Sequence, residues 1–135
     1  MQAHRTLRDF IKVLRKEGEL LSLSKPFDPK YEISTIISEL GKRKAPAVLF
    51  RKAKGFEISV IGNLFGTVRR LALALGIEED RLIEDVIPRL ENRIPPALIS
   101  EDPSEAVRIP AGKLDLLKVL PALTRSEERR VGKEC

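Results

Sequence analysis

Apolar residues recur with a helical period in four segments of the chain. In each segment they stand three and four positions apart, so they share one face. The segments cover residues 6–18, 28–41, 68–76 and 78–92. This spacing predicts four amphipathic helices, each with one side turned toward a core.

Capping residues predict where these helices begin and end. Thr6 is a suitable N-cap for the first helix, with Asp9 placed to complete a variant of the capping box. Asp28 followed by Pro29 predicts the start of the second helix. The helices are expected to end at glycines, which adopt the left-handed conformation of a C-cap readily. These glycines are Gly18, Gly41 and Gly76.

The same spacing predicts the buried side chains of the two later helices. The third helix is expected to bury Val68, Leu71, Ala72 and Leu75, and the fourth Leu82, Ile83, Val86 and Leu90. Pro88 has no backbone N–H, so it is expected to kink the fourth helix or split it.

Short apolar runs between the helices predict strands. Glu19 to Ser24 forms one, while Ala47 to Phe50 and Ile58 to Ile61 form a hairpin with Gly55 in its connection. The fold class expected is therefore α/β (α+β), a small mixed sheet of short strands packed by about four amphipathic helices.

The pattern weakens after Pro95-Pro96. A strand at 106–109 and a helical turn at 114–120 are the elements expected there. We divide the chain into a domain over 5–100, a connector over 101–124, and a charged tail over 125–135. The tail offers almost nothing to bury, so it is expected to be disordered and not native to the protein.

Composition narrows the function classes. A chain of 135 residues with 42% hydrophobic residues suits one compact domain. Neither a signal peptide nor an apolar run of the roughly 20 residues needed to span a membrane is evident, so a soluble, cytoplasmic protein is expected. One Cys, one His and one Met leave no basis for a zinc site or a disulfide framework.

The net charge of +5 comes from 25 Lys and Arg against 20 Asp and Glu, and the two signs alternate along the chain. This arrangement favours a solvated surface over a nucleic-acid site, and aromatic residues for base stacking are scarce at 4%. A free-standing basic α/β module that binds nucleic acid or another polyanion remains the alternative function.

The loop that leads from the last strand into the third helix carries the clearest candidate chemistry. Its residues of interest are Gly62, Asn63, Gly66, Thr67, Arg69 and Arg70, which we call the 62–70 loop. Free amides at a helix N-terminus and two arginines could hold an anion or contact another domain. The glycine spacing matches neither a dinucleotide fingerprint nor a P-loop, so a structural turn is the competing interpretation.

Several motifs together resemble the N-terminal region of the UbiD family of prenylated-flavin-dependent decarboxylases, which includes 3-octaprenyl-4-hydroxybenzoate carboxy-lyases. The resemblance spans about residues 5–124. The motifs that carry it are Leu7-Arg8-Asp9-Phe10-Ile11, Glu17-Gly18-Glu19, Asp28-Pro29, Pro46-Ala47-Val48-Leu49-Phe50, Gly62-Asn63-Leu64-Phe65-Gly66-Thr67, Arg69-Arg70 and Ala72-Leu73-Ala74-Leu75-Gly76.

The resemblance implies non-oxidative decarboxylation of an aromatic or α,β-unsaturated acid, such as a polyprenyl-4-hydroxybenzoate in ubiquinone biosynthesis. It implies prenylated FMN held through Mn or Mg and a potassium ion. In the family the catalytic Glu-Arg-Glu set and the metal ligands lie in a central domain downstream, so no catalytic, cofactor or metal residue is assigned to this chain.

We therefore expect an N-terminal fragment that is inactive alone. Its expected partners are the central and C-terminal domains of a parent enzyme, which is homo-oligomeric in the full-length family. A regulatory or assembly subunit related to the decarboxylases is a further option.

Overall fold

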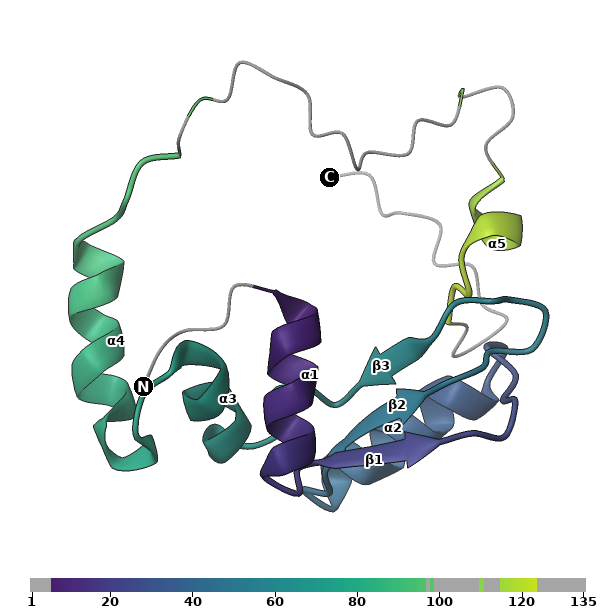
Figure 1. Ribbon diagram of the computed structural model, residues 1–135, viewed down its shortest axis with the longest axis horizontal. Helices are drawn as coiled ribbons and strands as arrows, with labels where there is room; N and C mark the ends of the chain where they lie inside the picture. Colours follow the sequence, from purple (N-terminus) through teal and green to yellow (C-terminus); the bar gives the residue numbers. More distant parts are fainter. Residues whose placement is uncertain (1–5, 97, 99–109, 111–114, 124–135) are drawn as a thin grey trace, which may run out of the picture.

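Figure 1 shows the computed structural model, which describes residues 6–96, 98, 110 and 115–123. The elements in chain order are α1 (Leu7–Lys16), β1 (Leu20–Leu23), α2 (Glu32–Lys42), β2 (Ala47–Phe50), β3 (Val60–Gly62), α3 (Val68–Leu75), the 3-10 helix η1 (Glu79–Arg81), α4 (Leu82–Glu91) and α5 (Leu116–Val119). The strand order is β1-β2-β3, with β1 parallel and β3 antiparallel to β2. The predicted α/β (α+β) class with a small mixed sheet and packed helices is confirmed.

One face of the sheet packs against α2, which lies behind the strands in Figure 1. Val48 and Phe50 alternate along β2 on this face, and both are fully buried with Ile33 of α2. The ring of Phe27 meets Phe50 edge to face, with ring centroids 5.3 Å apart. This cluster is the larger part of the core.

The opposite side of the sheet packs against α1. Phe10 and Leu14 are buried together with Ala47 of β2. Thr6 caps α1 as predicted, because its Oγ1 accepts a hydrogen bond from the Asp9 amide at 3.2 Å. The first helix is thus fixed by its own cap and by the core beneath it.

A third, smaller cluster forms between α3, α4 and the turn that follows α3. Ala72, Ile77 and Leu82 are its buried residues. Gly76 ends α3 in the left-handed conformation, with φ of 67°, as predicted. In Figure 1 this part of the molecule lies to one side of the sheet, with α4 outermost.

The predicted boundaries of the second helix were wrong at both ends. The structure begins α2 at Glu32, because Asp28 forms a turn instead: its Oδ1 accepts from the Lys30 amide at 2.8 Å, and its own amide donates to Glu32 Oε2 at 2.6 Å. At the other end α2 continues through Gly41, and Lys44 adopts the positive φ of 51°.

The predicted burial was also wrong on α3 and α4. Val68 and Ile83 are 55% and 70% exposed, and Leu71 and Leu90 are exposed as well. The helices form where expected, but only part of each apolar face meets the core. The helix α4 also continues unbroken through Pro88 rather than splitting there.

The remaining predictions concern strand ends and the chain beyond 96. The hairpin forms, although β3 begins at Val60 rather than at Ile58. The helix α5 lies within the predicted turn at 114–120. The predicted strand at 106–109 and tail at 125–135 lie outside the described residues. Within the part of the chain that the structure describes, no helix has both the length and the apolar character to cross a membrane.

Candidate functional site

The 62–70 loop runs from the end of β3 into the first turn of α3. Asn63 has a positive φ of 56°, a conformation that asparagine tolerates better than most residues. Its Nδ2 donates hydrogen bonds to the backbone carbonyls of Ala45, at 2.8 Å, and Pro46, at 3.2 Å. The side chain therefore ties the loop to the segment that enters β2.

The two glycines of the loop allow close packing against neighbouring side chains. A Cβ atom at Gly62 would overlap the side chain of Ile37 on α2. A Cβ atom at Gly66 would overlap the Asn63 carboxamide and would lie 2.8 Å from Arg70 Nη2. Any larger residue at Gly66 would therefore displace the polar groups that hold the loop.

Arg70 is fully buried and is the largest such side chain in the described part of the chain. Its Nη1 donates to Glu19 Oε2 at 2.8 Å, and its Nε donates to the Leu64 carbonyl at 3.2 Å. Thr67 caps α3 by accepting a hydrogen bond from the Arg70 amide at 3.3 Å. Arg70 thus joins α3, the loop and the residue that precedes β1.

Arg69, the second arginine, is ion-paired at the surface. Its Nη2 lies 3.3 Å from Glu17 Oε2, and its Nε lies 3.5 Å from Glu19 Oε1. Two arginines are therefore matched by two carboxylates. This matching leaves the loop with little unbalanced positive charge to attract an anion.

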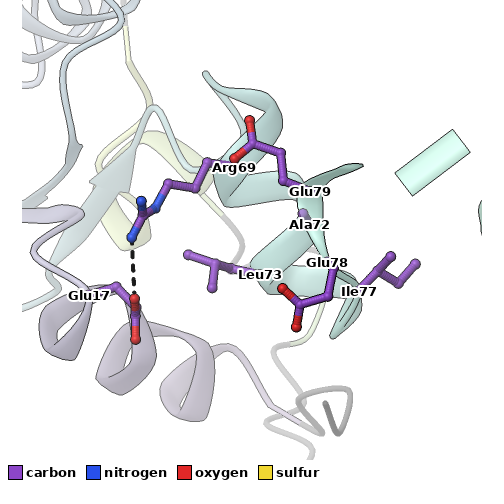
Figure 2. Close-up of a pocket in the computed structure, with 7 residues that line it drawn as sticks. All are labelled: Glu17, Arg69, Ala72, Leu73, Ile77, Glu78 and Glu79. Carbon is purple, nitrogen blue, oxygen red and sulfur yellow. Dashed lines mark hydrogen bonds and ion pairs between the residues drawn. The ribbon is translucent and has the colours of Figure 1, made fainter. Parts of the chain in front are cut away.

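A cavity of about 290 Å³ lies beside these ion pairs. Figure 2 shows Arg69 and Glu17 reaching toward each other across it, while Glu78 and Glu79 come from the turn after α3. Its other lining residues are Ala72, Leu73 and Ile77. None of the lining side chains is a histidine, cysteine or hydroxyl nucleophile, so the cavity offers no hydroxyl or thiol nucleophile paired with a histidine base.

Apolar side chains cover the outer side of the same loop and helix. Phe65 and Val68 are 61% and 55% exposed, and Leu71 is exposed to a smaller degree. The ring of Phe65 stacks on Phe10 of α1, with centroids 6.1 Å apart and 12° between the planes. The inward hydrogen bonds of Asn63 and Arg70 thus fix the loop that carries the exposed apolar side chains.

Sequence reasoning identified Asn63, Thr67 and Arg70 but missed Glu17 and Glu19. The partners Arg70 and Glu19 are 51 positions apart, so no local pattern links them. A buried arginine is expected to pair with a carboxylate, and this expectation is the one signal that could have pointed to Glu19. It applies only once Arg70 is known to be buried.

Residues 11–90 match the family described as the 3-octaprenyl-4-hydroxybenzoate carboxy-lyase N-terminal domain, UbiD_N. The chain belongs to the UbiD family. It is also similar to the UbiD-class enzyme HmfF from Pelotomaculum thermopropionicum, solved as an evolved dimeric form in complex with prFMN, with 27% identity and a TM-score of 0.77. That match covers 91% of this chain.

A second structure of HmfF, in complex with FMN, has 29% identity and a TM-score of 0.75. Vanillic acid decarboxylase from Sedimentibacter hydroxybenzoicus, in an open form, has 29% identity and a TM-score of 0.58 over 67% of this chain. This UbiD-family chain spans 28% of the HmfF chain and 20% of the vanillic acid decarboxylase chain. It therefore corresponds to the N-terminal domain of UbiD-family proteins.

Proposed function

We propose that this chain serves as the N-terminal, non-catalytic part of a larger decarboxylase that releases CO2 from an aromatic or α,β-unsaturated acid. The observation that carries the proposal is the match of 91% of this chain to only 28% of HmfF. A polyprenyl-4-hydroxybenzoate, and hence a role in ubiquinone biosynthesis, is the candidate substrate supported by the family description, and an aromatic acid is also the substrate named for the vanillic acid relative.

The cofactor of the parent enzyme is proposed to be prenylated FMN, because the HmfF structure contains prFMN. The metal ions proposed to accompany it are Mn or Mg and potassium. The residues that the structure describes do not fit the metal ions of such a site. Among them no cluster of three or more His, Cys, Asp or Glu side chains could hold a metal ion. Cofactor chemistry is therefore assigned to the part of the parent enzyme outside this chain.

The 62–70 loop is proposed to contact the flavin-binding part of that enzyme. Asn63 and Arg70 are buried or bonded inward, so they act as the frame, while Phe65 and Val68 provide the outer contact surface. An anion-binding role is less well supported, because Glu17 and Glu19 already neutralise the two arginines. Apolar contact is the interaction that the exposed surface favours.

The domain division belongs to the same proposal. Residues 5–100 would fold as the docking unit, 101–124 would connect it to the central domain, and 125–135 would contribute nothing to folding. Alone, the chain is proposed to be inactive. This part of the proposal is supported by the share of the HmfF chain that the match covers, which is 28%.

The proposal is tested with a chimera in which residues 1–123 of this chain replace the matching region of HmfF. We expect the chimera to retain prFMN, measured by its absorbance after gel filtration. The 135-residue chain incubated with the same cofactor should elute without it and should release no CO2 from aromatic or unsaturated acids. A chimera that folds without prFMN, or an isolated chain that retains it, would contradict the proposal.

The salt dependence of DNA binding distinguishes the alternative function, a module that binds nucleic acid or another polyanion, from the proposed one. A nucleic-acid-binding module would lose affinity steeply between about 50 and 200 mM salt. For this chain we expect no retention on immobilised DNA at either concentration, because surface cations such as Lys12 and Lys42 are paired with Asp9 and Glu39.

A further inference from the structure

The helix α4 carries two adjacent apolar faces, and only one of them is covered. Leu82 and Val86 pack against the cluster that contains Ala72 and Ile77. The second face consists of Ile83, Ile87 and Leu90, at spacing i, i+4 and i+7, with exposed fractions of 70%, 51% and 64%. We call these three residues the outer stripe of α4.

The helix is weakly anchored to the rest of the chain. Leu82 is its one buried residue, and Pro88 removes a hydrogen bond from the interior of a helix only ten residues long. One side-chain bond, from Arg89 Nη1 to the Leu75 carbonyl at 3.3 Å, links its far end to α3. Helices of this length are marginal in water without tertiary packing, so α4 needs a cover on its second face.

The outer stripe also continues along the chain. Ile94 and Leu98, which follow α4, are 91% and 102% exposed. Figure 1 shows α4 at the edge of the molecule. Exposed apolar side chains therefore continue past the end of α4.

We propose that the outer stripe of α4 is a docking surface for the remaining polypeptide of a UbiD-class decarboxylase. This inference rests on the proposed function. The occupant is argued from length: the match covers only 28% of the HmfF chain, so the greater part of such an enzyme lies outside this domain. A second copy is a poorer occupant, because two ten-residue helices bury far less than the about 1,200 Å² of a stable interface.

The charge beside the stripe defines the partner further. Glu84 and Glu91 are exposed and seven positions apart, so they lie on the same side of α4, next to Ile83 and Ile87. The facing surface is therefore expected to be an apolar ridge with lysine or arginine along one border. Such pairing would fix the orientation of the helix more than it would add affinity.

The test compares one triple variant, Ile83→Ser, Ile87→Ser and Leu90→Ser, in two settings. In the 135-residue chain the Tm should change by less than about 2 °C, because the side chains are exposed there. In the HmfF chimera described above, the Tm should fall by at least about 5 °C and prFMN retention should fall at least tenfold. The matched control is the double variant Leu21→Ser and Ile58→Ser, which alters exposed apolar residues elsewhere. It should change neither the Tm of the 135-residue chain nor the Tm and prFMN retention of the chimera.

The outcomes separate the two proposals. If the unsubstituted chimera fails to retain prFMN, the proposed function fails and this inference fails with it. If the unsubstituted chimera retains prFMN and the triple variant equals it in Tm and retention, the docking surface alone is overturned. Sedimentation that shows a dimer of the 135-residue chain, lost in the triple variant, would assign the stripe to a second copy and would also overturn the inference.

Discussion

Most apolar side chains of the sheet and α2 are buried or half-buried, whereas many of those in the α3–α4 region are exposed. In the sheet, Val48, Phe50 and Ile33 are completely buried. In the α3–α4 region, apolar residues that the helical spacing predicts to be buried, such as Val68 and Ile83, are more than half exposed. The difference teaches that the sheet and α2 form a core of their own, whereas α3 and α4 leave several apolar side chains exposed, the surface that we propose contacts further protein.

The largest expected effect tests the self-contained core. Phe50→Ala should lower the free energy of unfolding by about 3–5 kcal/mol, because it removes a fully buried ring that contacts Phe27. Phe65→Ala is the matched control on the other region, and it should cost less than about 1 kcal/mol, because its ring is largely exposed. Chemical denaturation of both variants gives the comparison. Equal losses would erase the distinction between the two regions.

The next effect concerns the ion pair that joins the two regions. Glu19→Gln should destabilise the chain by about 2–3 kcal/mol, because it leaves the Arg70 guanidinium buried without its carboxylate. Glu17→Gln should cost less than about 1 kcal/mol, because it pairs with the half-exposed Arg69. Urea denaturation of the two variants measures both values. A smaller loss for Glu19→Gln than for Glu17→Gln would show that Arg70 does not depend on its buried partner.

A pair of glycine substitutions should act in opposite directions. Gly66→Ala is expected to cost about 1–3 kcal/mol, because the new methyl group would meet Asn63 and Arg70 Nη2. Gly41→Ala lies inside α2, where the nearest atom to an added Cβ is Asn63 Oδ1 at 3.8 Å. It should stabilise the chain by up to about 1 kcal/mol, because alanine favours a helix. Thermal unfolding of both variants shows whether each substitution stabilises or destabilises the chain. Stabilisation by Gly66→Ala would disprove the close packing of the loop.

The smallest effect is a pH dependence on α2. The Lys42 side chain hydrogen-bonds to Glu39 and, with its charge, lowers the pKa of that carboxyl. A carboxyl with a lowered folded pKa contributes stability that is present above its unfolded pKa and is lost as the pH falls through the folded value. Glu39→Gln should therefore lower the Tm slightly at neutral pH and not at all in strong acid. A Tm difference that grows on acidification would contradict this sign.

The elements of this fold could be predicted from sequence to the extent that local signals fix them. Thr6 and Gly76 cap helices as expected, and the apolar run Ala47–Phe50 forms the predicted strand. The start of α2 was mispredicted, since Asp28 can either cap a helix or form a turn. The local sequence is compatible with both outcomes. In the structure the Glu32 side chain accepts a hydrogen bond from the Asp28 amide and so stabilises the turn.

Burial on α3 and α4 could not be predicted, for a different reason. Helical spacing shows which residues share a face, but it does not show what covers that face. Arg70 was read as a possible anion contact, yet it is the buried residue, while Val68 is exposed. The apolar faces of α3 and α4 are wider than the part that the core covers, so treating the whole pattern as a core pattern placed exposed side chains inside.

Amide hydrogen exchange tests the central claim most directly, with the 135-residue chain compared against its chimera with HmfF. We predict equal protection of β2 and α2 in both proteins, and at least about tenfold slower exchange in α4 of the chimera, because local opening of a covered helix costs more free energy. Equal exchange of α4 in the two proteins would contradict the claim that this region is completed by the rest of a decarboxylase.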